Sequence, residues 1–348
     1  MAYTTIDDPS KYFQIALYTG NAGTNNIVND GNSDLQPDWV WIKNRSTGGK
    51  DHGLFDSTRG TTKQLNSNNN NAENTVSTSL TAFNSDGFTL GADGGPNANS
   101  DSHVAWQWKA NGGTTSTNSS GSSNSTVQAN TTAGFSIVKR TGTGSAGATY
   151  GHGLGAVPDV IINKGLNANE WYSYFKSIGG GTHWIALESD GAKVDDANMW
   201  NDTDATSTVF TVGNSGGSNG SSVEYIDYCF TAIQGYSKFG SYTGNYNADG
   251  PFIYTGFKPA FVMVKEADNA NDWDLRDNAR DPNNHVDTWL RPNTTDQDGD
   301  SDAWDFLSNG FKIRQASNRN NRSGGTMIYM AFAEHPFVSS EGVPCTAR

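Results

Sequence analysis

Apolar residues along this chain come in short runs of four to eight residues that Gly, Asn, Asp or Pro interrupt. Val, Ile, Thr, Tyr, Phe and Trp are frequent in these runs, as they are in β-strands. No stretch of 11 or more residues keeps the i, i+3, i+4, i+7 spacing of an amphipathic helix. Short strands separated by turns predict an all-β protein built from antiparallel sandwiches or small barrels.

The same order of motifs occurs three times, with a period near 100 to 120 residues. Each copy begins with a turn similar to Tyr-Thr-Gly and continues, 17 to 19 residues later, with a strand led by proline. The three proline-led motifs are PDWVWIK at residues 37–43, PDVIINK at 158–164 and PAFVMVK at 259–265. Each copy closes with an alternating apolar strand, and these strands end at Ala110, Phe230 and Ala333.

These copies predict three tandem antiparallel β-sandwich modules, at residues 1–110, 134–235 and 236–348, each with its own two-layer core. Residues 111–133 are rich in Ser, Thr, Gly and Asn and contain almost nothing apolar, which predicts a flexible linker. Residues 234–241 join the second and third modules directly. We therefore expect those two modules to pack as a rigid pair and the first to be placed more independently.

Acidic residues outnumber basic ones, 36 to 23, so the formal net charge is -13. This charge repels phosphate backbones and anionic lipids, and we expect neither nucleic acid nor membrane insertion. No apolar run approaches the ~18 residues that span a bilayer, and the start of the sequence lacks the pattern of a secretion signal. The composition is rich in Asn, Ser, Thr and Gly and poor in Lys, which is typical of proteins that work outside cells. Since no secretion signal is visible, we expect a protein made in a host cytoplasm and carried outside on a virus particle.

The aromatic residues divide into those that recur in the copies and those that do not. Trp39 and Trp41 could form a sugar-stacking platform, but Phe261 and Met263 occupy the same positions in the third copy, which favours a core role. Aromatic residues without counterparts are better candidates for ligand binding. Trp200 and Trp304, both in polar segments, meet this criterion, with packing or a subunit contact as the alternative.

Four carboxylates alternate along the segment TTDQDGDSD, namely Asp296, Asp298, Asp300 and Asp302. This spacing lets several carboxylates face one Ca²⁺ ion at about 2.3–2.6 Å. The segment is not an EF-hand, because the twelfth position from Asp296 is Leu307. A metal site and a solvated acidic loop therefore both remain open.

An Asp and an Arg recur three residues apart, as Asp56 with Arg59 and as Asp277 with Arg280. Binding residues seldom repeat, so this spacing favours a structural ion pair or a hydrogen bond that stabilises a turn. The six histidines fall in different motif contexts, and neither a zinc-binding spacing nor a G-x-S-x-G elbow occurs. We predict no catalytic residue, although a pair of carboxylates suited to glycoside hydrolysis remains an alternative.

The motifs MAYTTIDDPSKYFQ, LQPDWVWIKNRS, FDSTRG, FNSDGFTLG, VAWQWKA and GTMIYMAFAEHPFV, in this order, resemble a domain of unknown function. That repeated, lectin-like domain is found in virion proteins of marine tailed phages, notably those that infect cyanobacteria and pelagic bacteria. The resemblance covers nearly the whole chain and implies a jelly-roll, concanavalin-type sandwich. The middle copy departs from it, since it lacks the Asp and Arg of FDSTRG and the Gly before Phe210.

The resemblance implies a place on a phage particle, as a tail fibre, spike or capsid decoration. The leading hypothesis is a tail-fibre or spike component that binds a host-surface glycan or receptor. It would act with other virion proteins and assemble as a homotrimer, with many weak sites giving avidity. The alternatives are a decoration or assembly protein without a receptor and, third, an enzyme that depolymerises glycans.

Overall fold

The computed structural model describes residues 2–346, apart from the side chain of Asp302. Nearly all of its regular structure is antiparallel β-sheet, which confirms the all-β prediction. The helical segments of this part of the chain are three or four residues long, as in α1 (Ala197–Trp200) and α2 (Gly216–Asn219). Among the same residues, no helix is long and apolar enough to cross a membrane.

Three arrays of four strands share one strand order. In each array the first and last strands of a repeat pair, and the proline-led strand pairs with the other side of the last one. The arrays are β1 (Phe13–Thr19), β9 (Ser102–Trp108), β3 (Trp39–Asn44) and β4 (Gly53–Asp56); β12 (Phe135–Thr141), β19 (Glu224–Phe230), β14 (Val160–Gly165) and β15 (Trp171–Phe175); and β20 (Ser237–Thr243), β27 (Thr326–Pro336), β22 (Phe257–Glu266) and β23 (Asp274–Asp277). We call them the inner sheets of units 1, 2 and 3.

The register is the same in all three inner sheets. Trp39 lies opposite Trp108, Val160 opposite Phe230 and Phe261 opposite Phe332. Residues at matching positions of the repeats therefore occupy matching places in the structure.

Each inner sheet carries an outer sheet on one face. The outer sheets are β2 (Asn25–Ile27), β8 (Phe88–Leu90) and β7 (Leu80–Phe83); β13 (Ala148–Gly151) and β18 (Val209–Val212); and β21 (Phe252–Tyr254), β26 (Gly310–Ile313), β25 (Gly299–Leu307) and β24 (Val286–Trp289). Val40, Ile161 and Val262, equivalent residues of the proline-led strands, belong to the apolar clusters of their own units. Each unit thus has a core of its own.

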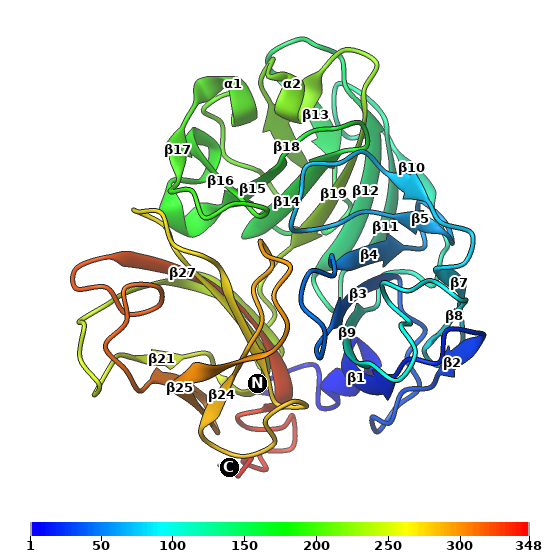
Figure 1. Cartoon of the computed structure of the whole chain (residues 1–348). Coiled ribbons are helices and arrows are strands. Elements are labelled where there is room, and N and C mark those ends of the chain that lie inside the picture. Colours follow the sequence, from blue (N-terminus) through cyan, green and yellow to red (C-terminus); the bar gives the residue numbers. More distant parts are fainter. Residues whose placement is uncertain (1, 347–348) are drawn as a thin grey trace.

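The opposite faces of the three inner sheets meet in a fourth, shared core, around which the units form three lobes (Figure 1). Aromatic contacts cross every junction: Trp39 stacks on Tyr228 with ring centroids 4.3 Å apart, Phe13 on Phe332 at 5.2 Å, and Phe230 meets Phe332 at 5.8 Å. Aromatic side chains bury about 150–250 Å² each, so at about 25 cal/mol per Å² each one contributes several kcal/mol. The units therefore share a fourth core in addition to their own three, and the expectation that the first module is placed more independently is wrong.

Residues 111–133 also differ from the expectation of a flexible linker. They contain β10 (Ser116–Asn118) and β11 (Ser125–Asn130), which extend the inner sheet of unit 2 beyond β12. Val127 packs into the core of unit 2, while Gln128 on the other face is fully buried at the junction with unit 1. Alternating contacts to two units order a segment whose composition alone is typical of a spacer.

A buried asparagine fixes the turn that opens each unit. Asn97, Asn219 and Asn321 are 0% exposed, and each stands five residues before the last strand of its unit. Each side-chain oxygen accepts a backbone N–H from the residue after the turn glycine, those of Asn21, Thr143 and Asn245, at 2.8–3.0 Å. This repeated bond joins the two ends of every unit.

Candidate functional site

One loop of each unit reaches the next unit, and we call these segments, residues 66–73, 186–193 and 291–298, the clasp loops. Each is the tip of a hairpin, formed by β5 (Lys63–Gln64) and β6 (Asn74–Thr75), by β16 (His183–Ala186) and β17 (Val194–Asp195), and by β24 and β25. Their last residues donate backbone N–H bonds across the junctions: Glu73 to Leu166 at 2.9 Å, Lys193 to Ala267 at 2.8 Å, and Asp298 to Arg45 at 2.9 Å. Unit 1 thus contacts unit 2, unit 2 contacts unit 3 and unit 3 contacts unit 1.

A buried lysine of each unit meets a neighbouring clasp loop. Lys43, Lys164 and Lys265 close the three proline-led motifs and are 0% exposed. Their Nζ atoms donate to the carbonyls of Thr295 at 3.4 Å, Asn70 at 3.4 Å and Asp190 at 3.1 Å, respectively. Burial lowers the pKa of each lysine to about 8, against the opposing effect of nearby carboxylates. The same residue with the same partner at three junctions has a structural role.

A ring N–H from each unit makes a second bond to the same loops. Trp171 Nε1 donates to the Asn66 carbonyl at 2.8 Å and Trp273 Nε1 to the Ala186 carbonyl at 2.9 Å. His52 takes this place in unit 1, with Nε2 3.0 Å from the Arg291 carbonyl, while Nδ1 accepts from an indole N–H of Trp41. Because a carbonyl only accepts and an indole only donates, His52 is neutral and protonated on Nε2. Burial, with the charge of Lys43 next, keeps its pKa well below the usual value.

The third residue of each clasp loop accepts a backbone N–H from its own unit. Asn68 accepts from His52 at 2.9 Å and Asn293 from Trp273 at 3.1 Å. In unit 2 the acceptor is a carboxylate, since Glu188 Oε2 lies 3.0 Å from the Trp171 nitrogen. Burial raises the pKa of Glu188 to about 7.

The repeated Asp and Arg are buried ion pairs that border the shared core. Arg59 Nε donates to Asp56, and Arg280 Nε donates to Asp277 at 2.6 Å, with every side chain at most 1% exposed. Burial disfavours the charge of Arg59, but Asp56 and its other neighbours outweigh this effect and raise its pKa. The two pairs are structural in this conformation, in agreement with their recurrence.

Each ion pair also receives a donor from another unit. Tyr228 Oη of unit 2 donates to Asp56 at 2.8 Å, and Trp106 Nε1 of unit 1 donates to Asp277 at 3.1 Å. At the junction of units 2 and 3 the corresponding residues are apolar, and all lie in the shared core. They are Phe175 and Ile178 in place of the pair and Met330 in place of the donor. The acceptor and its donor are thus absent together.

A groove of about 660 Å³ lies beside the clasp loop of unit 1. Its lining is polar and includes Lys50, Asp51, Gln64, Asn66 and Asn74. Several of these groups keep free hydrogen-bonding capacity: Lys50 Nζ and the amide of Asn74 have no partner among the described residues. The groove can therefore offer cationic, carboxylate and amide groups to a polar ligand.

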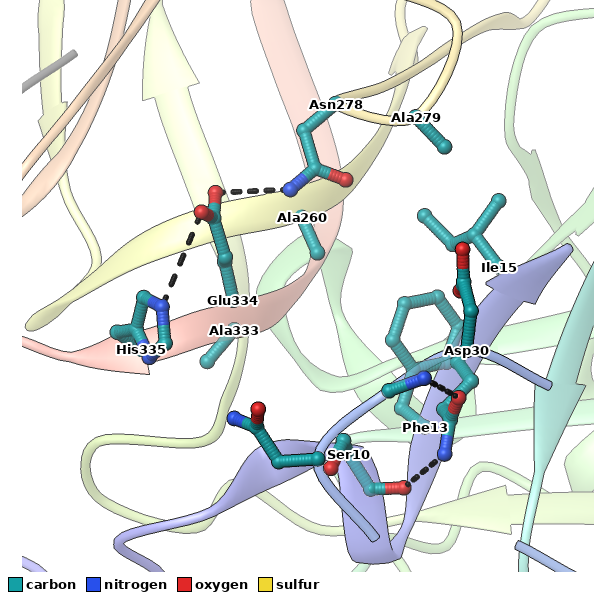
Figure 2. A pocket seen from close by; sticks show the side chains of 13 residues that line it. Ser10, Phe13, Ile15, Asp30, Ala260, Asn278, Ala279, Ala333, Glu334 and His335 are labelled. Carbon is teal, nitrogen blue, oxygen red and sulfur yellow. Dashed lines mark hydrogen bonds and ion pairs between the residues drawn. The ribbon is translucent and has the colours of Figure 1, made fainter. Parts of the chain in front are cut away.

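A second concavity, of about 280 Å³, lies between units 1 and 3. Figure 2 shows Phe13 and Ile15 of β1 on one side of it and Asn278, Ala279 and Glu334 of unit 3 on the other. Asn278 Nδ2 donates to Glu334 Oε2 at 2.8 Å, and Glu334 also pairs with Lys258 at 3.0 Å. We call this concavity the junction pocket.

A family model described as "Domain of unknown function (DUF7483)" matches residues 8–336. The chain belongs to the DUF7483 family. No curated protein and no solved structure matches it. Because the match runs through all three units, a DUF7483 domain is the whole three-lobed arrangement and not a single repeat.

The DUF7483 fold buries both tryptophans that the sequence suggested as ligand-binding residues. Trp200 is 1% exposed in the core of unit 2, where it meets Tyr174 edge-on at 5.8 Å. Trp304 is 0% exposed in the core of unit 3, stacked on Phe311 and beneath the Arg276 guanidinium. Neither indole can reach a ligand in this conformation. Each tryptophan packs in the core of its own unit, and the other units have no tryptophan at the equivalent position.

The alternating aspartates whose side chains are described, Asp296, Asp298 and Asp300, do not gather around one point. Asp298 pairs with Arg45 at 2.8 Å and Arg280 at 3.1 Å, and Asp296 pairs with Arg291 at 3.3 Å. Asp300 lies in β25, and the side chain of Asp302 is outside the described residues. No group of three or more His, Cys, Asp or Glu side chains in the described part of the chain is arranged to hold a metal ion. Arginines from two units take the place that the spacing suggested for Ca²⁺.

Proposed function

We propose that this DUF7483 protein is a non-enzymatic structural component of a bacteriophage particle, in a tail fibre or spike, that binds a host-surface glycan. Its units correspond to three jelly-roll modules with a lectin-like sandwich architecture. The protein is made in the host cytoplasm and works outside the cell on the virion. The motif resemblance supports the setting, and the groove of unit 1 supports the binding role.

The groove suits a glycan because of the groups that line it. Its volume of about 660 Å³ lies within the ~300–1,000 Å³ of typical ligand sites. A sugar hydroxyl both donates and accepts, and the groove presents the Asp51 carboxylate as an acceptor, the Lys50 ammonium as a donor and the Asn74 amide as both. The clasp loop that forms one wall is held at both ends, so the site is organised before a ligand binds.

A glycan array, followed by adsorption of the labelled protein to host cells, tests this proposal. We expect binding that the double substitution Lys50→Ala with Asn74→Ala weakens by about tenfold or more, the loss of two to three hydrogen bonds. Lys11→Ala is the matched control, because Lys11 is an exposed lysine outside the groove. Binding that survives the double substitution would exclude the groove as the glycan site.

We further propose that the protein acts as a homotrimer together with other virion proteins. Linked sites raise avidity by about 10²- to 10⁴-fold without tight individual contacts. Light scattering on the eluate of a sizing column measures the mass directly. A particle of one 37.3-kDa chain at micromolar concentration would refute the trimer.

A decoration or assembly protein without a receptor is the second candidate, and the placement of the aromatic residues favours it. The strongly exposed aromatic side chains of the described residues are Tyr246, Phe252 and Tyr254, all of unit 3 and none in the lining of the groove. Absence of binding to every glycan and host cell would leave this role. Release of reducing ends from host polysaccharide would instead show the third possibility, a hydrolase.

A further inference from the structure

The first strand of unit 2 is covered by β11, whereas the first strand of unit 1 ends its sheet. Gln128 of β11 lies opposite Ile137, which is 0% exposed. The corresponding residue of β1 is Ile15, and within residues 2–346 β1 pairs with β9 alone. Leu17, two residues further along this strand, is 43% exposed. The same sheet edge is therefore paired with an added strand in unit 2 and unpaired in unit 1.

At the open edge of β1, the residues whose N–H and C=O groups are free are the equivalents of those that bond to β11 in unit 2. Lys109 N donates to Tyr12 O, and Gly20 N to Asp101 O, so the even-numbered residues of β1 bond to β9. The peptide groups of Phe13, Ile15 and Leu17 consequently face away from the sheet. In unit 2 the equivalent groups are those of the residues from Phe135 to Lys139 that pair with β11.

The junction pocket lies where a side chain of an added strand would enter. At the junction of units 1 and 2, Gln128 Nε2 donates to Ser57 Oγ at 2.9 Å and Thr58 Oγ1 at 2.7 Å. Asn278 and Ala279, the equivalents of this Ser and Thr, line the pocket between units 3 and 1. The position that Gln128 fills at one junction is thus a cavity of about 280 Å³ at the other.

We propose that the β1 edge binds an extended polypeptide strand of a partner protein, which adds antiparallel to β1 and inserts one side chain into the junction pocket. Backbone bonds to Ile15 and Leu17 provide the affinity, and the pocket provides the selectivity. Asn278 Oδ1 and the carboxylate of Asp30 have no partner among the described residues. An amide or basic side chain opposite Ile15 is therefore the preferred occupant, and the net charge of -13 favours a strand without acidic residues.

A labelled peptide with the sequence of residues 123–132, SNSTVQANTT, tests the proposal by fluorescence anisotropy with the full-length protein. Its own β11 blocks unit 2, so the peptide can add only at an open edge. We expect saturable binding that Leu17→Pro weakens by at least about tenfold, because proline removes an N–H from the free edge while the bonds to β9 remain. Ser241→Pro, at the equivalent position of β20, is the matched control. The edge of β20 also ends its sheet, but the cavity beside it is smaller, about 180 Å³, and has Lys176 in place of Asn278, so this substitution should leave the affinity unchanged.

Ala279→Phe is a second variant that fills the junction pocket and leaves the backbone of β1 intact. We expect it to weaken the peptide by about tenfold as well, and to abolish the difference between this peptide and one with Ala in place of Gln128. Absence of saturable binding up to about 1 mM peptide would overturn the proposal. Concentration-dependent dimerisation that Leu17→Pro abolishes would also overturn it, since the edge would then belong to a second copy of this chain.

Discussion

The junctions around the shared core are of two kinds, polar and apolar. Where unit 1 takes part, a buried Asp–Arg pair borders the core and accepts a bond from Tyr228 or Trp106. Where units 2 and 3 meet, Phe175 and Met330 occupy those positions. The backbone bonds of the clasp loops are the same at all three junctions. The backbone bonds of the clasp loops and the apolar area of the shared core therefore hold the three units together. An ion pair and its donor can be replaced by apolar residues, provided that all of them are replaced together.

Removing one member of an Asp–Arg pair should have the largest effect on stability. In Asp56→Ala the Arg59 guanidinium stays buried without its closest carboxylate, and Tyr228 loses its acceptor. We expect the free energy of unfolding to fall by about 3–5 kcal/mol, measured by urea denaturation. Phe175→Ala is the control at the apolar junction, where a loss of similar size must come from a cavity and not from a charge.

The clasp loops offer a second contrast, because Glu188 stands where Asn68 and Asn293 do in the other units. Its pKa, raised from 4.5 to about 7 by burial, means that the folded protein binds more protons than the unfolded chain between these values. Stability contributed by this residue is therefore lost as the pH rises from 4.5 to 7. We expect Glu188→Asn to match the parent at about pH 4 and to exceed it by about 1–3 kcal/mol at about pH 8. Thermal melts across this range measure the difference, and a constant gap would contradict the assignment.

Transfer of the complete apolar set to the junction of units 1 and 2 should lower the stability less than Asp56→Ala does. The triple variant Asp56→Phe, Arg59→Ile and Tyr228→Met reproduces the residues of the junction of units 2 and 3. Since a buried ion pair and a well-packed apolar set of similar volume are often equivalent, we expect a stability within about 2 kcal/mol of the parent. A loss as large as that of Asp56→Ala would show that the junctions differ in more than these residues.

The outer carboxylates of the two ion pairs should show the smallest effect. Arg59 reaches Glu73 at 3.2 Å and Arg280 reaches Asp298 at 3.1 Å, and these acids are 16% and 20% exposed. We expect Glu73→Gln and Asp298→Asn each to lower the stability by about 0.5–1 kcal/mol, and less in high salt. Calcium should not change the melting temperature of either variant or of the parent, because arginines already bind Asp298.

The strands and their repetition could be predicted from the sequence, since each motif keeps its length, its apolar run and its flanking turn. The shared core also has a signal in the sequence. The runs WVWI, VII and FVMV are apolar at successive positions, which is typical of strands that are buried on both faces. β3 and β14 are indeed buried at every position. A second layer beyond the sandwich could have been inferred from these runs.

The candidate site was harder to predict. The clasp loops contact the neighbouring units through backbone atoms. The residues whose carbonyls bind the lysines, Asn70, Asp190 and Thr295, therefore differ in type, and the sequences of the loops show no common pattern. Trp200 and Trp304 do not recur, which favours a ligand-binding role, but a residue can be specific to one unit and still belong to its core. The asparagines five residues before each last strand did recur, and a search by spacing would have found them.

Ring closure also sets the order of events on the ribosome. The bond from His52 to the carbonyl of Arg291 joins residues 239 positions apart, so the part of the aromatic face of unit 1 that unit 3 covers stays exposed while the intervening chain is made. At about 5–20 residues per second this exposure lasts roughly 10–50 s. We expect nascent chains stalled before Arg291 to depend on chaperones, and release from that dependence to coincide with emergence of the last clasp loop.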